Sequence, residues 1–314
     1  MSGTPNTVTW QKRLGLFFAL SRTPHGVLDL ATPAVAALLW LGAFPPLATT
    51  LLGLMTAFAG YTAVYALNDL VDVANDRAQL AANPERDEKQ GGYIDAVGAH
   101  HPVALGLLSL PAAITWFLLW SLVAMVGAYL LNPVCLALFL AGAGLEVIYC
   151  LLLRISHLRT YVSGVVKTVG GIAAVFAVDP NPSPWFLLAL WAWLFCWEIG
   201  GQNVPADWHD LNEDSSTGAR TMLVVYGPRR ASLIILLSLS LAVVLNLVVL
   251  AVAPLRVPWS LSVAAWVAGL YLLLLPAWSL WRSQAGPGAT RLFNRASYYP
   301  LSMLLLVLLS LLAA

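Results

Sequence analysis

The chain has 314 residues, of which 60% are hydrophobic and only 10% are charged. Soluble domains carry roughly 25% charged residues, so this composition excludes an ordinary water-soluble protein and indicates a surface that faces lipid. A formal net charge of +1 gives no reason to expect nucleic acid as a partner. The three cysteines show no spacing typical of a disulfide framework or a metal–cysteine site.

Long apolar runs separated by short polar breaks predict nine membrane-spanning helices, because a span needs roughly 20 apolar residues. The predicted fold is therefore an all-α, polytopic membrane protein, a bundle of about nine transmembrane helices around a central cavity. Residues 1–314 are expected to form a single domain, and residues 1–23 a polar to amphipathic segment without the features of a signal peptide. The predicted spans are 25–42, 47–68, 103–122, 133–153, 161–178, 185–205, 231–253, 259–281 and 296–313.

The basic residues predict the orientation of the bundle. Of 16 Lys and Arg residues, Lys167 falls within a predicted span and Arg256 in an outer loop, which leaves 14 on the side of the N-terminus. Because cytosolic loops of membrane proteins are enriched in Lys and Arg, the N-terminus is predicted to be cytosolic and the C-terminus to lie on the opposite side. In a prokaryote this would be the inner membrane. The two long polar segments, 69–101 and 205–230, then also face the cytosol.

Seven of the chain's 15 acidic residues crowd into two short clusters at the start of these two segments. The first cluster, 68–76, reads NDLVDVAND. If the second span stays helical through Asp76, then Asn68, Asp72 and Asp76 follow one another at intervals of four residues and share one face, with Asp69 to one side.

The second cluster, 207–214, reads DWHDLNED. Asp207, Asp210 and Asp214 are at positions i, i+3 and i+7, which on a helix is again a single stripe. Hard divalent cations such as Mg²⁺ bind carboxylates together with phosphate oxygens. Either cluster alone is also explained by a solvated helix end, but two on one side of a chain with so few acids indicate a shared metal and polyanion site. The candidate metal ligands are Asp72, Asp76, Asp210 and Asp214.

A diphosphate at this site also requires basic partners. Lys167 is the most informative, because a lysine inside a span is unfavourable unless it is paired with an anion. The alternative for Lys167 is that its amine reaches the membrane interface. The candidates for binding diphosphate or substrate are Arg22, Arg77, Tyr149, Arg154, Lys167 and Arg220.

These motifs resemble those of the UbiA superfamily of intramembrane prenyltransferases. The match rests on the patterns Asn-Asp-x-x-Asp-x-x-x-Asp at 68–76 and Asp-x-x-Asp-x-x-x-Asp at 207–214, at the ends of the second and sixth of nine spans. It extends to Arg22-Thr23-Pro24 before the first span, to Tyr149 with Arg154 after the fourth, and to residues 218–221 after the second motif. The resemblance covers essentially the whole chain.

Two departures from the family pattern concern the handling of substrate. The family usually carries an Arg-Pro-x-x-x-Gly stretch after the first motif, whereas the segment here reads ERDEKQGGYIDAVGAHHPVA and is interpreted as lacking it. The basic pair after Tyr149 is reduced to Arg154, because Leu153 takes the other position. Because both departures lie where substrate would be handled, the sequence defines the type of reaction better than it defines the substrate.

The resemblance implies a Mg²⁺-dependent prenyltransferase that moves an isoprenyl group from its diphosphate to a small aromatic, quinone-like or lipid acceptor and releases diphosphate. Asn68, Asp69, Asp207 and Glu198 would be the catalytic candidates, and the arginines and Lys167 would bind the diphosphate. A terpene cyclase on the same fold would use the same donor and remains an alternative. A solute or cation transporter is a further alternative, although transporters place ionisable groups near the bilayer midplane.

Overall fold

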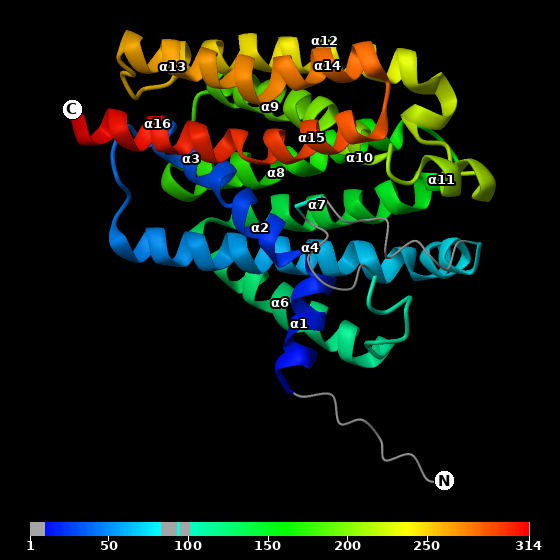
Figure 1. Ribbon diagram of the computed structural model, residues 1–314. Coiled ribbons are helices and arrows are strands. Elements are labelled where there is room, and N and C mark those ends of the chain that lie inside the picture. Colours follow the sequence, from blue (N-terminus) through cyan, green and yellow to red (C-terminus); the bar gives the residue numbers. More distant parts are fainter. Residues whose placement is uncertain (1–9, 83–92, 95–100, 314) are drawn as a thin grey trace.

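The computed structural model describes residues 10–82, 93–94 and 101–313, and these form a bundle of helices with no strand among them (Figure 1). Within this part of the chain, nine helical stretches are long and apolar enough to span a membrane. The predicted all-α, multi-pass fold is thereby confirmed. The elements are α1 (Trp10–Leu20), α2 (Thr23–Asp29), α3 (Ala31–Leu41), α4 (Leu47–Ala82), α6 (Leu110–Leu131), α7 (Pro133–Leu151), η1 (Leu152–Arg154), α8 (Arg159–Val178), α9 (Pro184–Glu198), η2 (Ile199–Asn203), α10 (Val204–Ala206), α11 (Leu211–Thr217), α12 (Met222–Val252), α13 (Trp259–Gly269), η3 (Leu270–Leu274), α14 (Leu275–Ser283), α15 (Gly286–Ser297) and α16 (Tyr299–Ala313).

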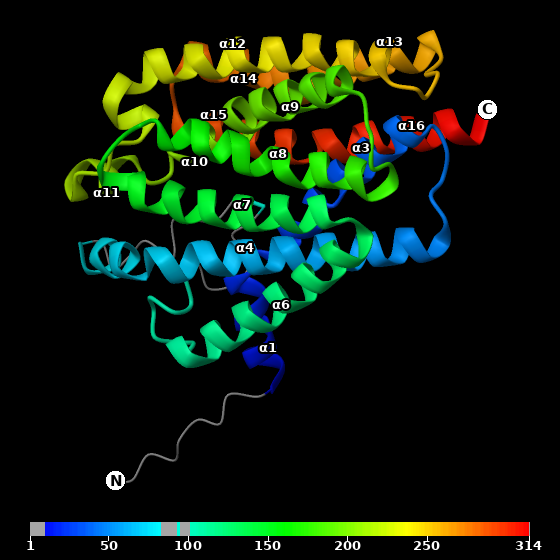
Figure 2. The same ribbon diagram turned by 180° about the vertical axis from the view of Figure 1, so that it is seen from behind.

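The helices pack side by side in successive layers. α6 lies against α4, and α7 lies between α4 and α8 (Figures 1 and 2). α8 contacts both α3 and α9, and α9 packs against α12. A large apolar core joins α3, α9, α12 and α16, and a smaller one forms where α1, α4 and α6 meet residues 103–108. Many large apolar side chains outside these cores remain exposed, as expected of surfaces that contact lipid.

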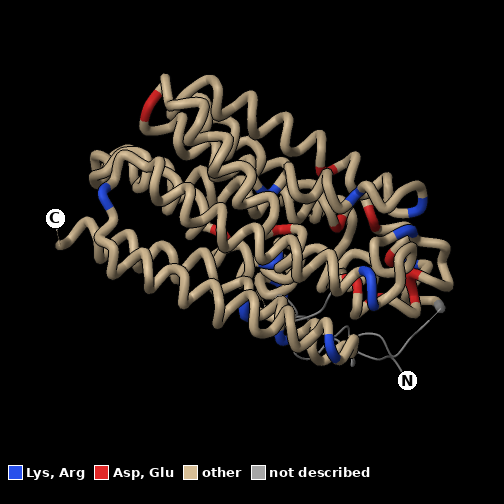
Figure 3. The backbone as a smooth tube through the Cα atoms, turned by 90° about the horizontal axis from the view of Figure 1, so that it is seen from above, with Lys and Arg blue, Asp and Glu red and all other residues tan. Residues whose placement is uncertain are grey.

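One end of the bundle carries most of the polar chemistry. The C-terminal end of α4 contacts α11 there, whereas the C-terminus and the connection from α3 to α4 lie at the opposite end (Figure 1). Charged residues are concentrated toward the same end as α11 (Figure 3). The fold thus brings the ends of the second and sixth spans together, although their acid clusters are far apart in the sequence.

The sixth span changes its helical geometry just before the second acid cluster. α9 passes into a π-helical turn over Ile199–Asn203 and then into the short α10. Gly200 allows this turn to lie close to α12, since a Cβ atom at that position would be 2.8 Å from Leu239 Cγ and 3.0 Å from the Ile235 carbonyl oxygen. Single π-helical turns of this kind occur frequently at functional sites.

Two expectations about local structure are wrong. The third span does not begin at residue 103, because Pro102 and Gly106 form turns and the helix starts at Leu110, next to Pro111. The second acid cluster is not a stripe on one helix, because α10 ends at Ala206 and a turn follows. The expected segment 69–101 is helical as far as Ala82, and its residues 83–92 and 95–100, including Arg86 and Lys89, lie outside the described residues.

Candidate active site

The first motif lies on an unbroken helix. α4 continues through Asp76 to Ala82. This meets the condition under which Asn68, Asp72 and Asp76 were predicted to share one helix face. The Asn68 amide donates a hydrogen bond to Glu146 Oε1 on α7 (2.7 Å), and Asn75 donates one to Asp72 Oδ1 (3.3 Å). The helix therefore fixes the backbone of this motif, while the Glu146 carboxylate orients Asn68 and the Asn75 amide orients Asp72.

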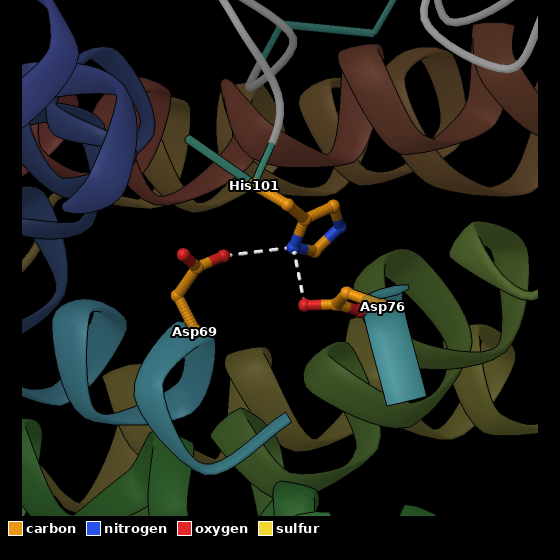
Figure 4. Close-up of side chains that lie close together, drawn as sticks. All are labelled: Asp69, Asp76 and His101. Carbon is orange, nitrogen blue, oxygen red and sulfur yellow. Dashed lines mark hydrogen bonds and ion pairs between the residues drawn. The ribbon is translucent and has the colours of Figure 1, made fainter. Parts of the chain in front are cut away.

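His101 joins the first motif from outside α4 (Figure 4). Its Nδ1 atom lies 2.7 Å from Asp69 Oδ1 and 2.8 Å from Asp76 Oδ2. Burial opposes protonation of the imidazole, but the carboxylates of Asp76 and Asp69 outweigh burial and raise the pKa of His101 to about 9. The first motif therefore contains a cationic partner that the acid pattern alone does not reveal.

The second motif is carried by a turn and a short helix. Asp207 lies in the turn after α10, Asp210 is the N-terminal cap residue of α11, and Asp214 is buried within α11. Burial raises the pKa of the Asp207 carboxyl well above its usual range; Asp214 and Asp210 add to this effect, and the charge of Arg159 opposes it. The turn thus presents carboxylates to the cavity without the regular spacing of a helix face.

An open cavity of about 930 Å³, which includes space open to solvent, separates the two motifs. α4 also contacts the second motif directly, since Gln79 Nε2 donates to Asp214 Oδ1 (3.3 Å). The arrangement provides many oxygen ligands, which hard divalent cations prefer, and two arginines that could bind an anion. The described residues that line the cavity are Arg22, Asn68, Asp72, Asp76, Gln79, Tyr93, His101, Tyr149, Leu153, Arg159, Asn203, Ala206, Asp207, His209, Asp210 and Asp214.

Two aromatic side chains hold these arginines in place. The Arg159 guanidinium lies 4.1 Å from the centre of the Tyr149 ring, and that of Arg22 lies 5.9 Å from the centre of the Tyr65 ring. Asn203 donates a hydrogen bond to the Tyr149 hydroxyl (3.1 Å), which fixes the tyrosine in turn. Stacking on an aromatic ring orients a guanidinium while leaving its N–H groups available to an anion.

Comparison with known proteins agrees with this architecture. A model of the UbiA prenyltransferase family matches residues 30–311. The chain belongs to this family. A 4-hydroxybenzoate octaprenyltransferase from Shewanella denitrificans is 26% identical over 220 residues, which cover 68% of each chain.

Solved structures share the fold. The apo structure of a UbiA homolog from Aeropyrum pernix has a TM-score of 0.71 at 19% identity and covers 92% of this chain and 97% of its own. A UbiA homolog from Archaeoglobus fulgidus bound to GPP and Mg²⁺ has a TM-score of 0.64 at 15% identity, with coverage of 93% and 99%. As a member of the UbiA family, the chain is an intramembrane prenyltransferase and an integral, multi-pass membrane protein.

Six of the 14 sequence-predicted site residues of this prenyltransferase do not line the cavity. Arg77, Arg154 and Arg220 are exposed, and the structure places none of them on the cavity wall. Asp69 is held by His101 beside the cavity. The eight predicted residues that do line it are Arg22, Asn68, Asp72, Asp76, Tyr149, Asp207, Asp210 and Asp214.

Lys167 and Glu198 belong to a buried polar network inside the membrane region. Lys167 Nζ lies 2.6 Å from Asp29 Oδ2, which also accepts a hydrogen bond from the Tyr65 hydroxyl (2.6 Å). Glu198 Oε1 accepts a hydrogen bond from Ser163 (2.9 Å). The lysine therefore has the anionic partner that its position requires, but this partner is a carboxylate of the protein.

Sequence reasoning missed His101, Arg159 and several polar residues of the cavity, namely Gln79, Tyr93, Asn203 and His209. A signal for His101 exists, because His101-Pro102-Val103-Ala104-Leu105-Gly106 keeps the spacing of the family's Arg-Pro-x-x-x-Gly stretch with His in place of Arg. The interpretation that this element is lacking was therefore wrong in part. Arg159 could have been suspected because it stands at the very start of an apolar span.

Proposed function

We propose that this enzyme transfers an isoprenyl group from an isoprenyl diphosphate to a hydrophobic acceptor, with Mg²⁺ as its cofactor. The observation that carries the proposal is the single open cavity that two aspartate motifs, Arg22 and Arg159 line together. The UbiA homolog from Archaeoglobus fulgidus with the same fold has been solved with GPP and Mg²⁺, and with DMAPP and Mg²⁺, which supports a donor of this class.

The side chains of the cavity fit a divalent metal. The four candidate metal ligands on its wall are all carboxylates, and an oxygen of a fifth carboxylate there, Asp207 Oδ2, is buried and makes no hydrogen bond to any described residue. Such a set of oxygen atoms suits Mg²⁺ and repels itself in the absence of a cation. When bound, the metal would stabilise the negative charge that grows on the leaving diphosphate. The residues proposed to hold it are Asp72, Asp76, Asp210 and Asp214.

Arg22 and Arg159 are the residues proposed to bind the diphosphate. Both line the cavity, and both are oriented by tyrosine rings. Lys167 is not retained for this role, because it is paired with Asp29 away from the cavity wall. Charge-assisted hydrogen bonds from arginine are well suited to phosphate oxygens.

Breaking the C–O bond of the donor leaves diphosphate and an allylic cation. The acceptor then forms a bond to the cationic carbon and gives up a proton. The Tyr149 ring could stabilise the cation, and Asn68 and Asp207 lie on the cavity wall where they could contact the reacting groups. Asp207 is the stronger candidate to accept the proton, because it is a carboxylate on the cavity wall whose Oδ2 makes no hydrogen bond to any described residue.

The acceptor is proposed to be a small aromatic, quinone-like or lipid molecule that approaches from the membrane. The two curated relatives from Shewanella species are 4-hydroxybenzoate octaprenyltransferases, so a phenolic acceptor is the first to test. We also propose that the cavity faces the cytosol, because 14 of the 16 basic residues are predicted on that side.

The decisive experiment measures diphosphate release by the protein in lipid nanodiscs. Prenyl diphosphates of increasing length would be supplied with Mg²⁺, with and without phenolic, quinone or lipid-alcohol acceptors. We expect Asp72→Asn and Asp210→Asn each to lower release about a hundredfold or more. Asp179→Asn is the matched control, because Asp179 accepts a hydrogen bond from Trp40 and does not line the cavity.

Two results would contradict the proposal. One is diphosphate release that persists in both motif variants, and the other is release that is unaffected by removal of divalent metal. Product analysis then separates the two reactions that share this donor: a product formed only with acceptor indicates transfer, and a cyclic hydrocarbon or cyclic terpene alcohol formed without acceptor indicates cyclisation.

A further inference from the structure

The last 100 residues of the chain carry positive charge only. No Asp or Glu follows Asp214, whereas seven arginines do, namely Arg220, Arg229, Arg230, Arg256, Arg282, Arg291 and Arg295. The enrichment of cytosolic loops in basic residues accounts for arginines at the ends of spans. It does not account for an arginine that lies deeper in the bundle, and Arg295 is such a residue.

Arg295 lies at a depth where a charge is unfavourable. It is part of the 28-residue candidate span that α15 and α16 form together. The next residue, Ala296, accepts a hydrogen bond from Trp197 Nε1 (3.0 Å), and Trp197 lies inside the sixth candidate span. Lys167 Nζ in turn lies 5.6 Å from the centre of the Trp197 ring. Arg295 is therefore near the level of Lys167, the other deep cation of the bundle.

These two cations have different partners. Lys167 is paired with the carboxylate of Asp29. Arg295 forms no ion pair with any acidic residue in the described part of the chain, and its contacts are with Tyr271 of η3. Its Cζ atom lies 4.7 Å from the centre of the Tyr271 ring, and Nη1 lies 3.5 Å from the Tyr271 carbonyl oxygen. Because a charge inside a span requires an anionic partner, this position favours an anion supplied by the lipid.

The surface around this guanidinium combines aromatic and basic side chains. Tyr271, Trp278 and Arg282 are exposed and lie on one face of η3 and α14, at intervals of seven and four residues. α15 packs beside α14 (Figure 1), and its exposed Arg291 lies one turn before Arg295. These five residues are called the α14–α15 surface below. Tyrosine and tryptophan favour the membrane interface, and arginine is well suited to binding phosphate.

α15 separates this surface from the cavity. Phe293 is two residues from both Arg291 and Arg295, so its side chain lies on the opposite face of the helix. There its ring contacts that of Tyr93, which lines the cavity, with ring centres 5.1 Å apart. A molecule on the α14–α15 surface is therefore not in the position of a donor that reacts in the cavity.

We propose that the α14–α15 surface binds the phosphate headgroup of an anionic phospholipid. Arg291 and Arg295 donate hydrogen bonds to the phosphate, and the Tyr271 ring orients the guanidinium of Arg295. The exposed apolar side chains of Val267 and Leu275 are available to contact the acyl chains. This lipid site goes beyond the proposed function and does not depend on it.

The test measures how much phosphatidylglycerol the full chain retains. The protein is reconstituted in phosphatidylcholine membranes with a varied fraction of phosphatidylglycerol, and native mass spectrometry counts the lipids that stay bound. We expect Arg295→Gln to raise the phosphatidylglycerol concentration for half-occupancy at least about tenfold, because charged hydrogen bonds are lost. Tyr271→Leu keeps every charge but removes the stacked ring, and should raise it roughly two- to fivefold.

Arg154→Gln is the matched control, because Arg154 is also exposed and predicted to be cytosolic but lies on η1, which packs against α7. It should retain phosphatidylglycerol as the wild type does. A thermal unfolding transition establishes that each variant is folded. If Arg295→Gln does not fold, Arg291→Gln replaces it with the same expectation, since Arg291 is exposed.

Several outcomes would overturn the lipid site. Equal retention of phosphatidylcholine and phosphatidylglycerol by the wild type would show that headgroup charge is not recognised. An equal loss in Arg154→Gln and Arg295→Gln would assign lipid binding to the general charge of this side of the protein. Displacement of the lipid by an equal concentration of inorganic phosphate, or preferentially by a prenyl diphosphate, would assign the surface to free anions or to the donor.

Diphosphate release, measured in the same preparations, keeps this proposal separate from the proposed function. A wild type that retains phosphatidylglycerol through Arg295 but releases no diphosphate would support the lipid site and contradict the proposed function. Release of diphosphate without selective retention of phosphatidylglycerol would have the opposite meaning.

Discussion

The two aspartate motifs have the same spacing but different backbones. Asp69, Asp72 and Asp76 follow the pattern Asp-x-x-Asp-x-x-x-Asp, and Asp207, Asp210 and Asp214 follow it too. The first lies within the 36-residue helix α4. The second is divided between a turn and the seven-residue helix α11. Equal spacing in the sequence therefore does not produce equal geometry, and the two motifs meet at the cavity by different means.

The difference also determines how each motif balances its charge. On α4 the carboxylates are crowded on one surface, and an imidazole from a distant segment lies between two of them. In the second motif the carboxylates come from a turn and from α11, and the charge of Arg159 on α8 acts on Asp207. The first motif depends on helix continuity, and the second depends on how η2 and α12 pack around Gly200.

The largest expected effect follows from interrupting α4. Ala74 is an exposed residue between Asp72 and Asp76, so replacing it removes no core contact. Ala74→Pro removes a helical hydrogen bond and forces a kink that costs about 3 kcal/mol or more. We expect diphosphate release to fall at least about a hundredfold, because the carboxylates move relative to the second motif. Ala74→Ser is the control, and activity retained by Ala74→Pro would show that helix continuity is not required.

The second largest effect tests the backbone of the second motif. Gly200→Ala places a Cβ atom 2.8 Å from Leu239 Cγ and 3.0 Å from the Ile235 carbonyl oxygen. We expect a loss of stability of about 1–3 kcal/mol from overpacking, with a parallel fall in diphosphate release as the turn shifts. Gly144→Ala is the matched control, since no other atom lies within 4 Å of its Cβ position. Equal thermal unfolding midpoints for the two variants would contradict the close approach of η2 and α12.

Much of the fold could be predicted from hydropathy and periodicity. Nine spans, the helix through Asp76 and the meeting of both acid clusters at one end follow from apolar run lengths and from alternation of loops between two sides. The start of the third span could not be predicted in this way. Val103 and Leu108 are buried in a small core rather than in a membrane helix, and hydropathy does not distinguish the two environments.

Site residues could be predicted where the residue type alone decides their role. They could not be predicted where the role depends on a partner that is distant in the sequence. The aspartates of both motifs, except Asp69, line one cavity, as their clustering indicated. Lys167 was interpreted as an anion-binding residue, but its partner is Asp29, which lies 138 residues away in the chain. The importance of Arg159 likewise depends on a tertiary contact, the stacking on Tyr149.

A smaller, selective effect is expected at Arg159. Arg159→Ala should raise the KM for the prenyl diphosphate about tenfold or more, because hydrogen bonds to charged groups contribute roughly 1.5–3 kcal/mol. Arg154→Ala should leave this KM unchanged, because Arg154 is exposed and does not line the cavity. Steady-state kinetics with a varied donor measures both. An equal increase in KM for the two variants would show that the positive charge of this region, rather than the stacked guanidinium, binds the donor.

The smallest effect concerns stability and has opposite signs in the two motifs. The pKa of Asp207 is raised in the folded protein above the reference value of 3.8, so the folded state binds this proton more tightly than the unfolded state does. Its contribution to stability is therefore lost as the pH rises above about 3.8. In metal-free protein at neutral pH, Asp207→Asn should raise the unfolding midpoint by about 2–4 °C, which corresponds to roughly 1 kcal/mol.

Asp69→Asn should instead lower this midpoint, because His101 loses one of its two carboxylate partners. Thermal unfolding of both variants at pH 5 and pH 8 measures the contrast, and the gain from Asp207→Asn should be larger at the higher pH. Destabilisation by both substitutions would mean that the negative charge of the second motif is neutralised by a nearby basic residue as completely as that of the first. In that case the difference between the helix and the turn would be one of backbone alone.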